Sequence, residues 1–390
     1  MEISKAERAF SNRLIRTGAF VLSSVLPAIF VCAACGAPGE PTPPSPPIPA
    51  AITDLAARQS GDGVLLTLTL PTRTVTNERL TEPPAVEIFR GTVKPDGKPD
   101  NKSFRLVYTL PGALLDTYTS EKHIQFKDPI APEEIQARPG ALLAYRVRTR
   151  AAKKRGSADS NTITVKAFPV PERITAVDAK VTEGAIELSW GAPRKTSAGA
   201  TMEGVSGYRV LRGEIDPASS DAAAHNIAQA KWKSPLTLVA PAPENSYRDT
   251  LFEFGKTYVY VVRSVALTPE GPVESDDSAP AVVTPRDTFP PAPPQNFVAA
   301  VTTPPGEAPS VGLSWSINLE NDLAGYRVYR SDAQDARGQL LTTDLLPAPA
   351  YRDMSVQQGR RYWYSVTAVD RAGNESVPAT VTADLTQLSQ

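Results

Sequence analysis

A short pattern of alternating residues occurs three times in this 390-residue chain, and it limits the possible folds more than any other feature. It reads Gly-Tyr-Arg-Val-Tyr-Arg at 325–330, Gly-Tyr-Arg-Val-Leu-Arg at 207–212 and, more loosely, Val-Glu-Ile-Phe-Arg at 86–90. The arginines that close the three copies lie 122 and 118 residues apart. A chain of this length has room for about two to four domains, so the spacing predicts a tandem array of one domain type.

Two further signals follow each copy in the same order. The first is an aromatic residue, a basic residue and an aspartate, and the second is a run in which inward and outward residues alternate. Alternation with a period of two is typical of half-buried strands. The aspartate signals lie at 126–128, 247–249 and 351–353, and the alternating runs lie at 145–148, 258–262 and 362–366.

Composition indicates strands joined by turns, and it limits the partners. The chain has 38 prolines and 24 glycines, and many short strands with turns rich in these residues predict an all-β fold. Its net charge of −1 offers no basic face, so we expect no nucleic-acid partner. The two cysteines, Cys32 and Cys35, both precede the repeats. We therefore expect no disulfide and no Cys/His metal site within a repeat, and each domain must rely on its hydrophobic core.

The N-terminus has the pattern of an export signal at 1–34. Four basic residues precede an uncharged apolar run at 18–31, which is shorter than the ~20 residues of a membrane span. A short apolar run after a basic start is typical of a signal peptide. The basic residues are Lys5, Arg8, Arg13 and Arg16.

The end of this segment, Cys-Ala-Ala-Cys at 32–35, resembles the lipobox of bacterial lipoproteins. Three of the four positions fit, and the family usually has Leu where Cys32 stands. The resemblance implies that Cys35 carries fatty acid such as palmitate and anchors the exported chain to the cell membrane. Gly36 after the cysteine implies the outer membrane if the cell has one. The alternative is an ordinary signal peptide cut near Ala34, which leaves a free thiol.

Residues 35–50 predict a tether rather than a domain. The part after Cys35 is dominated by proline, which favours extended polyproline II, so its 15 residues at 36–50 span up to ~45 Å at about 3.1 Å each. The repeats follow it, and short Pro-rich joints separate them. We assign them to 51–168, 169–286 and 287–386.

The second and third repeats carry residues that mark fibronectin type III domains. That family has a buried Trp on its second strand, a Tyr on its third, and a Leu-x-x-Gly-x-x-Tyr corner before its sixth. The resemblance implies three tandem fibronectin type III-like (Ig-like) β-sandwiches, with the corner hydroxyl bonded to backbone. The matching residues are Trp190, Tyr208, Phe252, Gly255 and Tyr258 in the second repeat, and Trp315, Tyr326, Val356, Gly359 and Tyr362 in the third.

The first repeat departs from that pattern. Leu70, Val86 and Leu143 stand where the family has its Trp, third-strand Tyr and corner Tyr. Its assignment rests on the repeat itself and on the alternation at Leu66, Leu68 and Leu70. An antibody-like domain is the alternative fold, and the absence of an inter-sheet cysteine pair disfavours it.

The sequence gives no sign of catalysis. His123 and His225 lie in different repeats and in polar surroundings, which is typical of surface loops. No nucleophile, zinc-protease or nucleotide-binding motif occurs. We therefore predict a protein that is not an enzyme, with no catalytic residue, cofactor or metal.

Two places are candidates for binding. The basic run Lys153, Lys154 and Arg155 at the predicted last hairpin of the first repeat could contact anionic glycan or lipid head groups, or simply be a solubilising tip. Trp232 lies in an insertion at 213–246, whose piece from Asp216 to Ala230 predicts a short helix capped by Asp216. Its ring could be a ligand platform or could cover the insertion.

These observations predict an exported, lipid-anchored spacer that also serves as a protein-binding or adhesion module. The expected partners are the membrane, through the anchor, and a protein or glycan of the envelope or the extracellular space. One alternative is a glycan-binding accessory protein, which aromatic residues in a row on one sheet face would favour. Another is an enzyme with an unrecognised site, which a deep pocket with convergent acids would favour.

Overall fold

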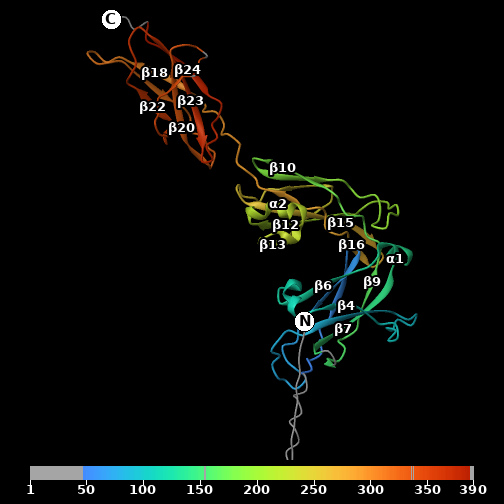
Figure 1. Ribbon diagram of the computed structural model, residues 1–390. Coiled ribbons are helices and arrows are strands. Elements are labelled where there is room, and N and C mark those ends of the chain that lie inside the picture. The colour runs from blue at the N-terminus through green and yellow to red at the C-terminus, as the bar shows by residue number, and fades with distance from the viewer. Residues whose placement is uncertain (1–46, 153–154, 335, 337, 387–390) are drawn as a thin grey trace, which may run out of the picture. The chain divides into compact units, whose positions relative to one another are not determined.

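The structure is a computed structural model that describes residues 47–390 apart from 153–154, 335, 337 and 387–390. Figure 1 shows strands along the whole described chain and only a few short helices. The signal peptide, Cys35 and most of the predicted tether lie outside the described residues. Within the described part of the chain, no helix has the length and apolarity needed to cross a membrane.

The first sandwich consists of two antiparallel sheets. One sheet has the order β1-β2-β6-β5, and the other has the order β4-β3-β7-β8, with β9 beside β7. Side chains from both sheets, including Leu66, Ile88 and Tyr145, meet in one buried cluster. The strands are β1 (Ala56–Ser60), β2 (Gly63–Leu68), β3 (Ala85–Thr92), β4 (Arg105–Leu110), β5 (Thr119–Ser120), β6 (His123–Pro129), β7 (Ala141–Ala152), β8 (Arg155–Gly156) and β9 (Ile163–Ala167).

The second sandwich repeats this plan with a three-stranded sheet, β10-β11-β14. The opposite sheet has the order β13-β12-β15-β16, with β17 beside β15. Its core includes Ile186, Val210 and Tyr260. The strands are β10 (Val177–Thr182), β11 (Ala185–Trp190), β12 (Gly207–Ile215), β13 (Trp232–Ala242), β14 (Ser246–Asp249), β15 (Thr257–Thr268), β16 (Gly271–Glu274) and β17 (Ala281–Val283).

The third sandwich has the sheets β18-β19-β22 and β21-β20-β23-β24. Its core includes Leu313, Val328 and Tyr364. The division of strands between sheets is that of the second sandwich, and the prediction of tandem fibronectin type III-like sandwiches is confirmed. The strands are β18 (Val298–Thr302), β19 (Ser310–Ser314), β20 (Leu323–Ser331), β21 (Gln339–Leu340), β22 (Ala350–Asp353), β23 (Arg361–Asp370) and β24 (Ala379–Asp384).

The family's aromatic residues take the places that the resemblance implies. The rings of Trp190 and Tyr208 pack edge to face with centroids 5.2 Å apart, and those of Trp315 and Tyr326 do so at 5.1 Å. Edge-to-face contact is a preferred arrangement of aromatic pairs because ring edges are positive and ring faces negative. All four side chains belong to buried clusters, so they fill the space between sheets rather than bind a ligand.

The two tyrosine corners also form. The Tyr362 hydroxyl accepts a hydrogen bond from the Gln357 backbone N–H at 3.1 Å, and Tyr258 accepts from Glu253 at 3.0 Å. Gly359 adopts a φ of +81°, which an L side chain rarely adopts, so glycine suits this turn.

The first sandwich closes this end differently because it has Leu143 in place of the corner Tyr. The short helix α1 (Pro132–Ala137) precedes β7, and Ile130 and Ile135 pack with Leu143 and Ala167 in a small separate cluster. Apolar packing thus replaces the hydroxyl-to-backbone bond of the other two corners.

The N-terminal border of the first sandwich includes residues from the end of the predicted tether. The Ala50 N–H donates to the Arg73 carbonyl, and the Val75 N–H donates to the Ile48 carbonyl, each over 2.9 Å. Pro49 forms an isolated bridge with Thr74, as Pro171 does with Thr196 in the second sandwich. The repeated pairing holds the entering chain against its own sandwich.

Candidate functional site

The three repeated sequence signals meet in one buried cluster per sandwich, which we call the inter-sheet triad. In the third sandwich, Arg330 Nη1 and the Tyr364 hydroxyl each donate to Asp353 Oδ2 over 2.8 Å. The corresponding distances are 2.6 and 2.7 Å in the second sandwich, and 3.0 and 2.8 Å in the first. The triads are Arg90–Asp128–Tyr145, Arg212–Asp249–Tyr260 and Arg330–Asp353–Tyr364.

Each triad connects the two sheets of its sandwich. The aspartate lies on β6, β14 or β22, in the sheet that contains the first two strands of the repeat. The arginine and the tyrosine are direct cross-strand partners in the opposite sheet, as Arg330 and Tyr364 are on β20 and β23. One carboxylate oxygen therefore accepts two hydrogen bonds from across the core, in repeats that contain no cysteine.

Burial decides the electrostatics of the triad. The Asp353 side chain is 2% exposed, whereas Arg330 keeps 19% of its side chain in contact with solvent. Burial alone raises the pKa of Asp353, but hydrogen bonds from Ser355, Tyr364 and Arg330 outweigh it and hold that pKa below its usual value. Burial, together with the adjacent carboxylate, raises the pKa of all three triad tyrosines. The charges of each triad thus pair with each other between the sheets of their sandwich.

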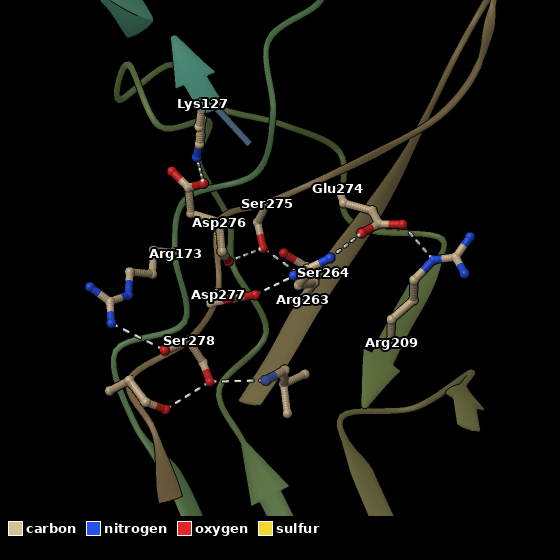
Figure 2. Close-up of polar contacts among 12 residues, drawn as sticks. Lys127, Arg173, Arg209, Arg263, Ser264, Glu274, Ser275, Asp276, Asp277 and Ser278 are labelled. Carbon is tan, nitrogen blue, oxygen red and sulfur yellow. Dashed lines mark hydrogen bonds and ion pairs between the residues drawn. The ribbon is translucent and has the colours of Figure 1, made fainter. Parts of the chain in front are cut away.

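The outer face of the second sandwich carries an ion-pair network. Arg209 on β12 and Arg263 on β15 stand opposite each other, which places two like charges together. Glu274 pairs with Arg209 at 2.6 Å and with Arg263 at 3.2 Å, and Asp277 pairs with Arg263 at 2.5 Å. Figure 2 shows Glu274 between the two guanidinium groups. In this part of the face, the charged side chains are paired with one another.

Serines beside the network bind the backbone of the neighbouring strand. Ser275 Oγ accepts from the Ser264 N–H and Ser278 Oγ from the Val262 N–H, each over 3.0 Å (Figure 2). Ser376 Oγ accepts from the Ala368 N–H over 3.0 Å in the third sandwich. Ser264 and Ala368 occupy the same position in the two sandwiches, so Ser275 and Ser376, which bond to them, are equivalent. The preceding glutamates, Glu274 and Glu375, are therefore equivalent as well.

The insertion covers the remaining part of this face in the second sandwich. Ala223 of helix α2 (Ser220–His225) packs with Ile215 and Val259 in a buried cluster. The Asp216 side chain accepts from the Ala218 N–H at 2.9 Å, so the predicted cap is confirmed. The predicted single helix is wrong, because Asn226 ends α2 and caps a further turn. The three pieces are Pro217–Ser219, Ser220–His225 and Ile227–Gln229.

The same face of the third sandwich is organised around Glu375, the equivalent of Glu274. Arg327 Nη1 donates to Glu375 Oε2 at 2.7 Å, and the Tyr329 hydroxyl and Thr367 Oγ1 donate to Oε1 at 2.6 and 2.7 Å. Burial raises the pKa of Glu375, but these three hydrogen bonds outweigh it, so that pKa lies below its usual value. Thr367 occupies the position of Arg263, opposite Arg327 on the neighbouring strand, and Tyr329 is held by its hydroxyl.

A cavity of about 720 Å³ lies over this face, with Tyr329 and Trp363 in its lining. Trp363 stands between the inward-facing Tyr362 and Tyr364 on β23, so it faces outward. Trp363 is not among the predicted binding residues, although the alternation at 362–366 already requires an outward residue at this position. A sheet face with two aromatic rings and hydroxyl groups can bind a flat, uncharged ligand by stacking and hydrogen bonds.

The predicted binding residues do not form one site. Lys153 and Lys154 lie outside the described residues, as does Cys35. Arg155 is exposed on β8, which pairs with β7 in antiparallel fashion.

Trp232 opens β13 on a different sandwich and is 38% exposed. Its ring lies against Gly213, where an added Cβ would stand 2.5 Å from Cζ3. Trp232 therefore covers the backbone of β12 at the edge of the insertion.

The histidines take part in surface hydrogen bonds. His123 Nδ1 lies 3.1 Å from Thr69 Oγ1, and His225 Nδ1 lies 2.8 Å from the Asp221 carbonyl within helix α2. Both side chains are exposed. These bonds pair His123 with a threonine hydroxyl and His225 with a backbone carbonyl, and neither bond involves a carboxylate.

Three aspartates of the third repeat place a carboxylate oxygen within 4.8 Å of one another. They are Asp287, Asp322 and Asp370. Carboxylate oxygens are ligands that Ca²⁺ prefers. However, Asp370 is already bonded, since the Asn374 backbone N–H and side-chain amide donate to its two oxygens at 2.8 and 2.7 Å. This bonding forms the predicted hairpin turn, and we assign no metal to the cluster.

Comparison with known proteins gives one partial sequence match. No protein-family model matches the chain. Exoglucanase B of Cellulomonas fimi is 33% identical over 158 residues, which cover 39% of this chain and 13% of the exoglucanase. The chain thus corresponds to a small part of that relative.

Structural comparison gives fibronectin type III proteins. The FN1–FN3 domains of chicken CNTN1 have 15% identity and a TM-score of 0.24, covering 86% of this chain and 98% of that structure. A segment of two fibronectin type III domains from chicken tenascin has 15% identity and a TM-score of 0.34, covering 55% and 99%.

The triad tyrosines predict how the chain unfolds in alkali. A tyrosine whose pKa is raised in the native state contributes stability that is present below its ordinary pKa of about 10 and lost as pH rises above it. We expect Tyr145, Tyr260 and Tyr364 to ionise only as their sandwiches unfold. After a pH jump, absorbance at 295 nm should show a slow phase that coincides with loss of far-UV circular dichroism.

Tyr364→Phe is the matched variant, since it should reduce the amplitude of the slow phase. If all 12 tyrosines ionise within the mixing time while circular dichroism stays native, the triad hydroxyls are not buried as described.

Proposed function

We propose that this chain is a non-enzymatic spacer that carries binding surfaces at the cell envelope. The observation that supports this most is the triad, which occurs in all three sandwiches with the same register and bonding. In each sandwich, the hydrogen bonds of the triad connect the two sheets and stabilise that sandwich independently of the others. The triad aspartates are only 2–5% exposed and hold the two sheets of their sandwich together, as a mechanically independent module requires.

A spacer also requires an attached end and a segment that holds the domains away from the membrane. The lipobox-like segment at 32–35 supports attachment through Cys35, and the proline tract after it supports a stand-off from the membrane. The outer faces differ among the repeats, as the ion pairs of Arg263 in the second sandwich and the Tyr329–Trp363 face in the third illustrate. Such differences support binding of an envelope or extracellular protein by faces that share one scaffold.

A glycan-binding accessory role is the second candidate. It is favoured by two aromatic side chains on one sheet face of the third sandwich, Tyr329 and Trp363, which line a cavity. The partial match to a protein named Exoglucanase B adds support from sequence, although it covers 13% of that protein.

Small-angle scattering tests the spacer proposal. A single compact body of ~340 residues should have a radius of gyration of roughly 20 Å. A spacer made of three sandwiches joined by short Pro-rich segments should clearly exceed this figure. Residues 51–390 are suitable for the measurement because they leave out the tether. A value close to the compact figure, with no change after the joint prolines are replaced by Gly and Ser, would contradict the proposal.

Replacement of Cys35 tests the anchor separately. Cys35→Ser should abolish fatty-acid labelling and release the chain from the membrane fraction, because lipidation requires the thiol. Cys32→Ser is the matched control and should keep both label and membrane partition. Labelling that persists in Cys35→Ser, or that disappears in Cys32→Ser alone, would contradict the assignment of the lipidated residue.

A further inference from the structure

We propose that the outer face of the third sandwich binds a neutral, β-linked glucan in the cavity over Tyr329 and Trp363. This inference rests on the glycan-binding candidate above and assigns it a site and a ligand class.

The same positions are covered in the second sandwich and open in the third. Cross-strand pairing aligns Gly213 and Val259 of the second sandwich with Ser331 and Trp363 of the third. Val259 is fully buried beneath Ala223 of the insertion helix. Among the described residues between β20 and β22, no helix occurs. A large aromatic residue thus occupies the third sandwich where the second has a covered valine, and it remains partly exposed.

The lining of the cavity suits a sugar. Its volume of about 720 Å³ is within the ~300–1,000 Å³ of typical ligand sites. Two aromatic rings provide apolar surfaces, and side-chain hydroxyls around them provide hydrogen-bond donors and acceptors. These side chains are Tyr329, Trp363, Ser365, Thr367, Thr380 and Thr382.

The charges beside the cavity favour an uncharged ligand. Glu375, the charged residue of the lining, pairs with Arg327 and accepts from Tyr329 and Thr367. An anion would face this carboxylate, and a cation would compete with an ion pair that is already formed. The same network fixes the Tyr329 ring, so the aromatic surface is organised before a ligand arrives.

A β-linked glucan fits this surface better than a peptide does. When the linkages are β-1,4, as in cellohexaose, its pyranose rings form an extended ribbon with flat faces, which can lie along two aromatic rings on one sheet. A peptide that adds to a sheet uses the backbone groups of an edge strand, whereas Tyr329 and Trp363 project from the face of β20 and β23.

Isothermal titration of the full chain, purified in mild detergent, tests the site with cellohexaose as the probe. Trp363→Ala should weaken binding by about tenfold or more, the size expected for a central aromatic anchor. Trp363→Phe keeps a ring and should bind between the two. Met354→Ala is the matched control, because it removes an exposed apolar side chain of the same sandwich outside the cavity lining and should bind like the original chain. Maltohexaose, whose α-linkages curve the chain, should bind more weakly.

The outcomes separate the site from the function. If the original chain binds cellohexaose and Trp363→Ala and Trp363→Phe bind equally well, the site is wrong while a glycan-binding role stands. If Trp232→Ala removes binding instead, the ligand platform lies on the second sandwich. If neither cellohexaose nor maltohexaose binds, both the inference and the glycan-binding role fail. Thermal melts of every variant identify any loss of binding that comes from unfolding.

Discussion

The fold depends on one interaction, a carboxylate of one sheet that accepts hydrogen bonds from an arginine and a tyrosine of the other. Placing an aspartate in a core is unfavourable unless it is paired and hydrogen-bonded. Asp353 satisfies this condition through Arg330, Tyr364 and Ser355. Removing one partner of such a buried pair typically costs ~3–5 kcal/mol, which is a large share of a domain's ~5–15 kcal/mol. The triad therefore fixes how the two sheets face each other.

Because the triad and the core lie between the sheets, the outer faces are free to differ. On the outer face of the sheet that contains β12 and β15, the second sandwich forms ion pairs among Arg209, Arg263 and Glu274. Helix α2 covers the rest of that face. The third keeps the glutamate as Glu375 but has Thr367 at the position of Arg263, and the Tyr329 hydroxyl also donates to Glu375. A change of a few outward residues thus converts a surface whose charges pair with one another into a surface with a cavity. The residues that hold the sandwich together stay the same.

Much of this could be predicted from the sequence, because period-two alternation and the spacing of Trp and Tyr residues fix strands and inward faces directly. The sandwich fold, the corner at Tyr362 and the Asp216 cap follow from local pattern. The contact of Asp353 with Arg330 and Tyr364 does not, because strand pairing between distant segments decides it. Trp363 is predictable only in part: the alternation at 362–366 predicts its outward side chain, but the cavity beside it depends on β24, and no helix covers it among the described residues between β20 and β22.

A double-mutant cycle in the first sandwich tests the central claim most directly, because that repeat lacks the family's Trp and corner Tyr. Arg90→Met, Tyr145→Phe and the double variant should be compared by native-state hydrogen exchange of the β3 and β7 amides, which reports the free energy of opening. The two side chains share Asp128, so we predict a coupling of about 0.5–3 kcal/mol. Effects that add to within ~0.3–0.5 kcal/mol would mean that the triad is not an energetic unit.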